Sequence, residues 1–334
     1  MEKVIKELTE LVKTPNKLKK LVLAPSYIKG KYDSHAVDCP FVFKHKNKFY
    51  MTFVGWDSKG YRTGLAVSSD LLTWEKKKMI LGRGPKGSVT EYNAALTWIM
   101  RDNDLFGSGE LKKVNGEYLG TYHAYPGAGY ETGPAVIGLC RSKDLLNWKL
   151  EKPFLFPEKK NKWEGGGLYK SCLVENNGKY YMFYNAKNDK PENWREQIGV
   201  VVSSDLIHWK RSKLNPVLKN GKKGGFDDLF ASEPCVLRYK KTWVMFYFGL
   251  CSDGHARESV AFSKDLIHWK KSNEVLVDVG KEGQADSLYA HKPSIFYYKK
   301  KLYHYYCAVK KNPSGKIGEI KHNEVRGIAV ATDE

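Results

Sequence analysis

The sequence has no apolar run approaching the roughly 20 residues that cross a membrane, which argues against a membrane-spanning helix. Its first residues, MEKVIKELTELVK, interrupt the apolar positions with charges, whereas a signal peptide needs an uninterrupted apolar core. The spacing of Val4, Leu8 and Leu11 predicts a short amphipathic helix. We therefore expect a cytoplasmic protein with a helical extension over 1–16 and a single folded domain over 17–334.

Closely spaced cysteines are also missing. The six cysteines stand far apart and form no Cys-x-x-Cys pair, so the sequence offers no cluster of zinc ligands. Most of them lie in apolar, strand-like runs, at positions 39, 140, 172, 235, 251 and 307. We expect reduced, buried thiols and no metal site.

A concentrated basic stripe is absent as well, although the formal net charge is +19. The lysines are dispersed through predicted turns such as KHKNK, KKVNGE and YYKKK, whereas nucleic-acid binding needs basic side chains gathered on one face. We therefore expect no nucleic-acid partner and no membrane partner. A solvated cationic surface is the simplest interpretation, and an anionic substrate or a polyanion is the alternative.

What the sequence does contain is an internal repeat of the pattern Ser-x-Asp-Leu-x-x-Trp. Its copies read SSDLLTW at 68–74, SKDLLNW at 142–148, SSDLIHW at 203–209 and SKDLIHW at 263–269, and a truncated copy, GIAVATD, stands at 327–333. A small-apolar strand precedes each complete copy and a charged strand follows it. Ser and Asp side chains bond nearby backbone N–H groups, so the pattern predicts a tight hairpin turn with a structural role.

A second repeated unit precedes each hairpin and predicts two more strands around a polar turn. Its copies are FVFKHKNKFYMTFV at 41–54, ELKKVNGEYLGTYH at 110–123, CLVENNGKYYMFYN at 172–185, CVLRYKKTWVMFYF at 235–248 and SIFYYKKKLYHYYC at 294–307. Four strands in each of five units predict an all-β fold, a five-bladed β-propeller with four antiparallel strands per blade and a short N-terminal helix. We expect residues 17–25 to supply the missing fourth strand of the last unit.

In a propeller the first strand of each blade lines the axis, so its entrance marks the candidate site. Charged residues stand at these entrances: Asp38, Glu110, Lys170, Glu233, His291 and Lys292. Charges in a narrow, dry channel are costly unless they are paired or used. In one interpretation, Asp38 and Glu233 pair with Lys170 and Lys292 to seal the axis. We favour the other, a catalytic site built by acids that converge from separate blades.

Loops between the second and third strands of each blade share this face. They carry aromatic rings that stack on sugars, together with charged and imidazole groups. The predicted substrate-binding residues there are Trp56, Asp57, Arg62, His123, Arg195, His255 and Arg257, besides Lys170, His291 and Lys292.

With these motifs the sequence resembles the five-bladed glycosidases of glycoside hydrolase families 43, 32, 68, 117 and 130, over residues 20–334. Asp38 in DCP is similar to the Asp of blade one in family 43, with one extra residue before Pro. Glu110 in GEL stands where that family has a second Asp, and Lys170 stands where it has the acidic Glu of blade three. Glu164 in WEGGG lies just upstream, whereas Glu233 in SEPCVL matches the expected motif from blade four.

Glycoside hydrolysis needs one carboxyl group that donates a proton and a second that activates water or attacks the sugar. We expect a glycoside hydrolase for short oligosaccharides, with Asp38 as base, Glu233 as acid and Glu110 positioning the sugar. The resemblance implies an inverting reaction. No cofactor is expected to be required, although relatives that hold calcium on the axis imply an alternative in which His291 is a water-mediated ligand.

Two other functions remain open at this stage. The first is an inorganic-phosphate-dependent phosphorylase similar to family 130, in which cations bind phosphate. The candidate cations are Lys170, Lys292, His291, Arg62 and Arg257. The second is a non-catalytic carbohydrate-binding propeller.

Overall fold

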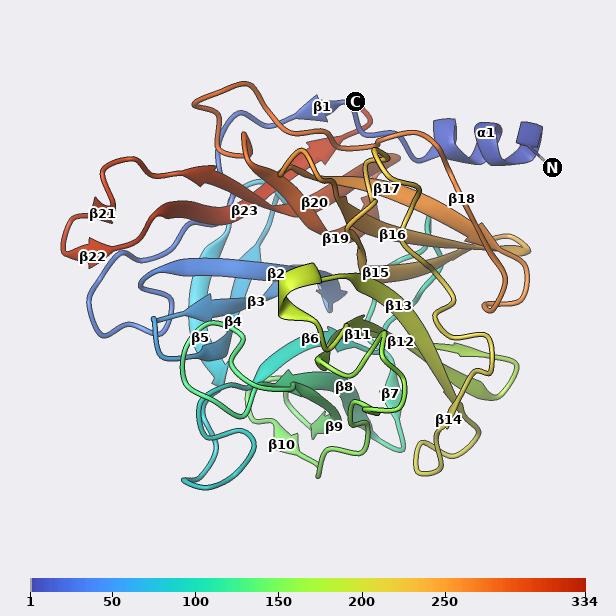
Figure 1. The fold of residues 1–334 in the computed structure, drawn as a ribbon, viewed down its shortest axis with the longest axis horizontal. Coiled ribbons are helices and arrows are strands. Elements are labelled where there is room, and N and C mark those ends of the chain that lie inside the picture. Colours follow the sequence, from blue (N-terminus) through green and yellow to red (C-terminus); the bar gives the residue numbers. More distant parts are fainter. Residues whose placement is uncertain (1) are drawn as a thin grey trace.

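The computed structural model describes residues 2–334 and is built mostly of β-strands. The predicted N-terminal helix is present as α1 (Glu2–Leu11). Among the described residues, none of the helices combines the length and apolarity that a membrane crossing requires. Figure 1 shows the sheets arranged around a common centre, with α1 at the periphery.

The strands of residues 2–334 group into five successive units, each with four main antiparallel strands. The first unit contains β2 (Ala36–His45), β3 (Lys48–Trp56), β4 (Tyr61–Ser68) and β5 (Glu75–Leu81). The second contains β6 (Ala95–Ile99), β8 (Glu117–Ala124), β9 (Val136–Ser142) and β10 (Lys149–Leu150), with β7 (Lys113–Val114) added to β8. The third contains β11 (Gly167–Asn176), β12 (Lys179–Lys187), β13 (Glu196–Ser203) and β14 (Lys210–Arg211), with the 3-10 turn η1 (Pro191–Asn193) between β12 and β13.

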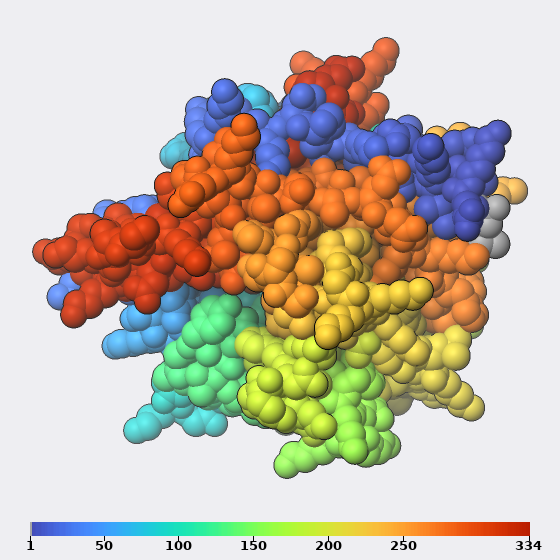
Figure 2. Space-filling view, turned by 45° about the horizontal axis from the view of Figure 1, so that its top comes forward, coloured from blue at the N-terminus to red at the C-terminus, as the bar shows by residue number. Residues whose placement is uncertain are grey.

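The fourth unit contains β15 (Phe230–Tyr239), β16 (Thr242–Leu250), β17 (Ala256–Ser263) and β18 (Trp269–Lys271). The fifth contains β19 (Tyr289–Tyr298), β20 (Lys301–Lys311), β23 (Glu324–Thr332) and β1 (Asn16–Lys17). A small hairpin of β21 (Lys316–Ile317) and β22 (Ile320–Lys321) precedes β23 and projects from the surface at the left of Figure 2. The inner strands β2, β6, β11, β15 and β19 contact one another in this order, and β19 also contacts β2.

The N-terminal part of the chain supplies the fourth strand of the fifth unit, as predicted. Asn16 lies opposite Thr332 of β23, and Lys17 lies opposite Ala331. The pairing continues further along the chain, where Leu23 and Ile328 exchange backbone hydrogen bonds in both directions. Segments from opposite ends of the sequence are therefore joined in one sheet.

The second unit differs from the prediction in its inner strand. Residues 110–123 were expected to hold both strands of a hairpin, but they hold β7 and most of β8, while the inner partner of β8 is β6 (Ala95–Ile99). The short apolar run ALTWI therefore takes the central position. Glu110 lies instead at the far end of β2, where it forms a bridge with Lys44.

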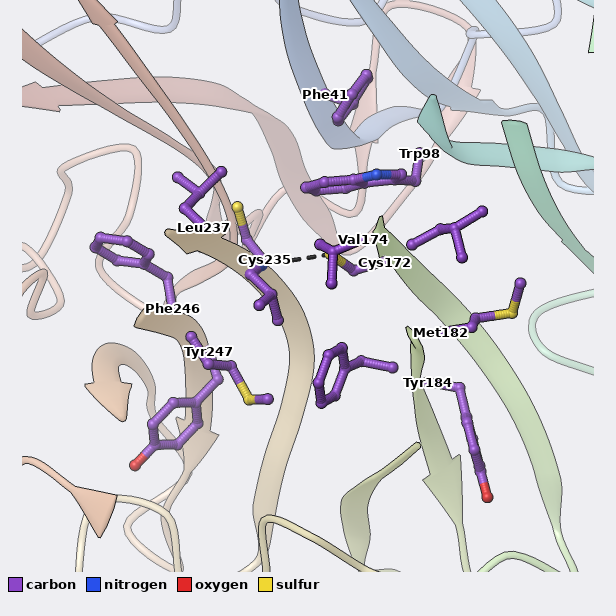
Figure 3. Packing of buried hydrophobic residues seen from close by; sticks show 14 of the residues in the cluster. Phe41, Trp98, Cys172, Val174, Met182, Tyr184, Cys235, Leu237, Phe246 and Tyr247 are labelled. Carbon is purple, nitrogen blue, oxygen red and sulfur yellow. Dashed lines mark hydrogen bonds between the residues drawn. The ribbon is translucent and has the colours of Figure 1, made fainter. Parts of the chain in front are cut away.

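Apolar side chains from neighbouring units interlock beneath the inner strands (Figure 3). The rings of Phe41 from β2 and Trp98 from β6 pack with their centroids 4.8 Å apart. Cys172 of β11 accepts a hydrogen bond from the backbone N–H of Val236 in β15, at 3.3 Å. Within the described residues the six cysteines are buried and free, in agreement with the predicted thiols.

Candidate active site

A register irregularity interrupts the inner strand of every unit in residues 2–334 at a similar depth. The shifts occur between Asp38 and Phe41, Leu96 and Trp98, Tyr169 and Ser171, Ser232 and Cys235, and His291 and Ser294. A left-handed residue stands inside the shift at Cys39 (φ 47°), Lys170 (φ 36°), Glu233 (φ 55°) and Lys292 (φ 69°). A β-bulge leaves its extra residue outside the ladder and re-aims the side chain. The bulges thus free charged side chains from the sheets.

These charged groups converge in one ion-pair network. Lys292 Nζ lies 2.8 Å from Asp38 Oδ2 and 3.3 Å from Glu233 Oε1. Lys170 Nζ lies 3.5 Å from Glu233 Oε2. The ion pairs of the sealed-axis interpretation are therefore present. Asp38, Glu233 and Lys292 nevertheless also line a cavity of about 20 Å³, here called the floor cavity, so the network borders open space.

Arg326 of β23 completes the surroundings of Asp38. Its Nη1 lies 3.0 Å from Asp38 Oδ2, and its Nη2 lies 2.9 Å from Glu324. Burial alone would raise the pKa of Asp38, but Lys292 and Arg326 hold it well below its usual value. Asp38 is therefore a buried, negatively charged carboxylate at neutral pH.

Two histidines near the network are neutral. Burial, reinforced by Lys292 and Lys170, lowers the pKa of His123 to about 3. Its Nδ1 accepts the backbone N–H of Lys170 at 3.2 Å. Burial likewise holds the pKa of His291 well below its usual value, and His291 Nδ1 donates to the carbonyl of Cys307 at 2.9 Å. Both rings thus act as fixed dipoles and not as cations.

Two larger cavities open above the floor cavity and share residues with it. The outer cavity, about 660 Å³, reaches from Asp38 to the segment after β22, and its lining includes Trp56, Tyr61, Tyr130, Tyr289, His322 and Arg326. The side cavity, about 270 Å³, reaches from Glu233 and Lys292 to Trp194, Glu196, Phe230 and Phe248. We call the three cavities together the axial pocket. Its aromatic walls and charged floor suit a sugar ring with several hydroxyl groups.

The loop between β8 and β9 covers part of the pocket. Tyr130 in this loop is 57% exposed and lines both larger cavities. Its ring meets those of Trp56 and Tyr61 nearly edge-on, with centroids 6.0 and 6.4 Å apart. The neighbouring Glu131 lines the floor cavity and the side cavity. Neither residue was among those predicted from the sequence.

Glu196, at the start of β13, is a further carboxyl group in the wall of the side cavity. It accepts hydrogen bonds from Asn185 Nδ2 (3.0 Å), Ser232 Oγ (2.6 Å) and the Tyr169 hydroxyl. Burial and the charge of Glu131 raise the pKa of Glu196 to about 7, although these hydrogen bonds oppose the shift. It therefore titrates near neutral pH.

Several predicted residues do line the axial pocket. Asp38, Glu233, Lys292, His291, His123 and Trp56 contribute to its walls or floor. Lys170 lies buried beside Glu233. The alignment of inner strands on the repeated turn located most of these residues correctly.

Other predicted residues lie elsewhere. Glu110 was placed at the axis, but the structure puts it in an ion pair with Lys44 (3.0 Å) and leaves its side chain 37% exposed. This prediction was wrong because the inner strand of the second unit was misassigned. Glu164 is buried between Tyr184 (2.8 Å) and Arg211 (3.0 Å), outside the pocket lining.

The predicted rim residues also remain outside the lining of the three cavities. Asp57 pairs with Arg62 and Arg83. Arg257 pairs with Asp253 and Asp278, and His255 lies 3.6 Å from Asp253. Arg195 donates to the carbonyl of Trp194.

Arg326 is a basic residue of the site that was not predicted from the sequence. Counting back from Thr332, which takes the place of the repeated Ser, Arg326 corresponds to Arg62 and Arg257 of the other units. Extending the repeat by one residue before GIAVATD would have found it.

The residues near the axis do not fit the calcium ion that the resemblance implied. Asp38, His291 and Cys307 bring ligand atoms within 4.8 Å of one another. Calcium binds about six to eight oxygen atoms, whereas this group offers one carboxylate, one imidazole and one thiol. Lys292 and Arg326 also neutralise Asp38, and their charges disfavour a further cation.

The family model described as "Glycosyl hydrolases family 32 N-terminal domain" matches residues 108–285, which is more than half of the chain. Among curated proteins, the chain is similar to the 1,2-beta-oligomannan phosphorylase of Thermoanaerobacter sp. (strain X514). The two are 27% identical over 138 residues, which cover 40% of this chain and 46% of that relative. The match therefore spans about half the length of the curated relative.

Two solved structures are similar over the whole chain. One is described as a complex of BT0996 and RGII, with 28% identity and a TM-score of 0.84 over 100% of this chain and 96% of the other. The second is described as "Glycoside hydrolase", with 27% identity, a TM-score of 0.82 and the same coverage.

Proposed function

Because this chain belongs to the family of the glycosyl hydrolases family 32 N-terminal domain, within the superfamily of five-bladed propeller glycosidases, we propose that it cleaves glycosidic bonds of short oligosaccharides in the axial pocket. Its five four-stranded units are then the blades of a closed propeller, which the pairing of β1 with β23 supports. One observation carries the proposal. Two buried carboxylates, Asp38 and Glu233, border a cavity that opens between aromatic walls.

Asp38 acts as the base in this mechanism. A base must be ionised before the reaction, and Lys292 and Arg326 keep Asp38 charged despite its burial. As water attacks the anomeric carbon, Asp38 accepts its proton. The backbone N–H of Cys39, which donates to Asp38 Oδ1 at 2.8 Å, fixes the carboxylate in one orientation.

Glu233 has surroundings that suit a charged carboxylate better than a proton donor. Lysine ammonium groups lie 3.3 Å from its Oε1 and 3.5 Å from its Oε2. The nearest oxygens of Glu233 and Asp38 also flank the same Lys292 nitrogen, so they are at most about 6 Å apart. Inverting enzymes separate acid and base by about 6.5–9.5 Å. We assign Glu233 the task of stabilising positive charge at the anomeric carbon.

The test is Asp38→Asn, assayed on a panel of aryl glycosides and oligosaccharides. Loss of the base should lower turnover at least about 100-fold, and the wild-type product should appear with inverted configuration by NMR. Asp57→Asn is the matched control, because Asp57 lies in the same unit but pairs with Arg62 and Arg83 outside the pocket lining. Near-normal turnover in Asp38→Asn contradicts the proposal, and sugar binding without any product favours a binding module.

Phosphorolysis is the second candidate, supported by Arg326 and Lys292 beside Asp38 and by the phosphorylase name of the curated relative. These two cations suit a phosphate ion, and equally the carboxylate of an anionic sugar. Release of sugar that depends strictly on inorganic phosphate would support this candidate. Release at full rate in phosphate-free buffer would support hydrolysis.

A further inference from the structure

The loop between β8 and β9 presents a carboxyl group to the pocket in a strained conformation. Glu131 has a φ of 47°, which is uncommon for a residue other than glycine and tends to occur at functional sites. Backbone hydrogen bonds hold the loop: Gly127 donates to Thr132, and Gly129 donates to Lys59 in the first unit, each at 3.0 Å. The position of Glu131 is therefore set by the loop and by its anchor on a neighbouring unit.

Glu131 faces the space bordered by Glu233 and Lys292. All three residues line both the floor cavity and the side cavity. Glu131 Oε2 is buried and has no hydrogen-bond partner among residues 2–334; Lys187 Nζ lies 3.6 Å away, beyond hydrogen-bonding distance. Buried carboxyl oxygens are rarely left without a partner. This oxygen is available to a substrate oxygen.

The other acidic groups around the pocket are more fully engaged. Asp38 is held by Lys292 and Arg326, Glu233 lies between two lysines, and Glu324 lies 2.9 Å from Arg326. Glu196 accepts three hydrogen bonds through its two oxygens. Among these acids, Glu131 combines a loose ionic contact with an oxygen that has no hydrogen-bond partner in the described part of the chain.

We propose that Glu131 is the proton donor of the cleavage reaction, an assignment that rests on the function proposed above. The Glu131 carboxyl proton moves to the glycosidic oxygen while the bond from this oxygen to the anomeric carbon breaks. Asp38 takes one proton from the water whose oxygen forms the new bond to that carbon. Asp38 then releases its proton to solvent and Glu131 regains one, so the net reaction consumes one water molecule.

The groups around Glu131 allow a proton to be stored beside it. Lys187 of β12 favours the charged form of Glu131, and Glu196 of β13 disfavours it. The other titratable groups that face it are the neutral side chains of Tyr61, Tyr125, Tyr130 and Tyr169. Since burial and Glu131 raise the pKa of Glu196 to about 7, the pair of glutamates retains a proton until the pH approaches neutrality.

The test is Glu131→Gln, which removes the proton and preserves the shape of the side chain. It is assayed on 2,4-dinitrophenyl and 4-methoxyphenyl derivatives of a glycoside that the wild type cleaves. The first leaving group departs without a proton, and the second needs one. We expect a loss of at least about 100-fold in kcat/KM on the methoxyphenyl glycoside and less than about tenfold on the dinitrophenyl glycoside. The basic limb of the pH profile should also disappear, and Glu131→Asp should restore part of the rate.

Glu196→Gln and Glu233→Gln are the matched controls, and thermal melting checks that each variant is folded. If one of them shows the dependence on leaving group while Glu131→Gln behaves as the wild type, the assignment to Glu131 is overturned. An equal loss on both glycosides in folded Glu131→Gln overturns it as well. If the wild type cleaves no member of the panel and no oligosaccharide, the proposed function itself fails.

Discussion

At the scale of single residues, the pocket contains carboxyl groups with opposite electrostatic surroundings. Asp38 contacts two cations, whereas Glu196 is buried next to another acid. The same functional group is thereby held charged in one place and close to neutral in the other. Such a separation allows a base and a proton reservoir to coexist at one pH.

Glu196→Gln should change the pH dependence of stability. The folded pKa of Glu196 is about 7, against 4.5 for the free side chain, so the folded protein binds the extra proton between these values. Wild-type stability therefore falls as the pH rises through this window, and a glutamine, which does not titrate, removes that loss. From about pH 4 to about pH 8 the variant should gain about 3 kcal/mol relative to the wild type.

Urea unfolding of both proteins at the two pH values measures this difference. Glu192→Gln serves as the control because Glu192 is exposed in η1. Parallel stability curves for wild type and Glu196→Gln would contradict the raised pKa.

Residues on the inner strands were predictable, and residues on the covering loop were not. Asp38, Glu233 and Lys292 follow from counting along a repeat, because repeated strands place equivalent positions at equivalent depths. Glu131 follows a glycine-rich loop with no counterpart in the other units, so no register fixes it. Glu196 starts a strand that looks apolar, and only the fold shows that Glu131 lies near it.

At the scale of the element, the repeated turn is a compact hydrogen-bonded unit. In the third copy, Ser203 Oγ accepts the N–H groups of Asp205 (3.2 Å) and Leu206 (2.9 Å). Asp205 Oδ1 accepts the N–H of His208 at 2.8 Å, and Trp209 Nε1 donates to the Leu206 carbonyl at 3.2 Å. The other three complete copies repeat these bonds, which confirms the structural role that the sequence predicted.

Ser203→Ala should therefore lower stability without changing catalysis. It leaves the N–H groups of Asp205 and Leu206 without their side-chain acceptor, at a cost of about 1–2 kcal/mol. Chemical denaturation measures the loss. Ser204→Ala, next to it and exposed, should change stability little. A drop in kcat/KM with unchanged stability would show that the turn contributes to the site instead.

The same scale explains the main error of the sequence-based fold. The inner strands of the other units directly precede their partners, but the inner strand of the second unit, β6, is separated from β8 by β7 and the segment 100–112. The polar turn before β8 resembles the other turns, so the sequence pattern places the inner strand too late. Arg101 in the inserted segment donates to the carbonyl of Ile295 at 2.8 Å, which ties this segment to the fifth unit.

At the scale of the whole molecule, the pairing of β1 with β23 holds the two end segments together. A chain that begins at residue 24 should be much less stable, because it unpairs β23 and removes the buried Val22 and Leu23. Losing about 3 kcal/mol of apolar burial corresponds to a fall in Tm of about 6–12 °C.

Calorimetry on that chain and on one that begins at residue 9 tests this expectation. The second chain loses most of α1 but keeps the backbone pairing of residues 16–23 with β23. It should melt closer to the wild type. Equal melting temperatures for all three chains would show that the N-terminal strand contributes little to closure.

The bulges on the inner strands have a consequence for protein engineering. Cys39, Lys170, Glu233 and Lys292 stand outside the regular pairing of their strands. Their side chains can therefore be exchanged with less disturbance of the hydrogen-bond ladders than those of their neighbours. A combinatorial library randomised at these four positions would vary the charge of the catalytic floor while the surrounding scaffold stays constant.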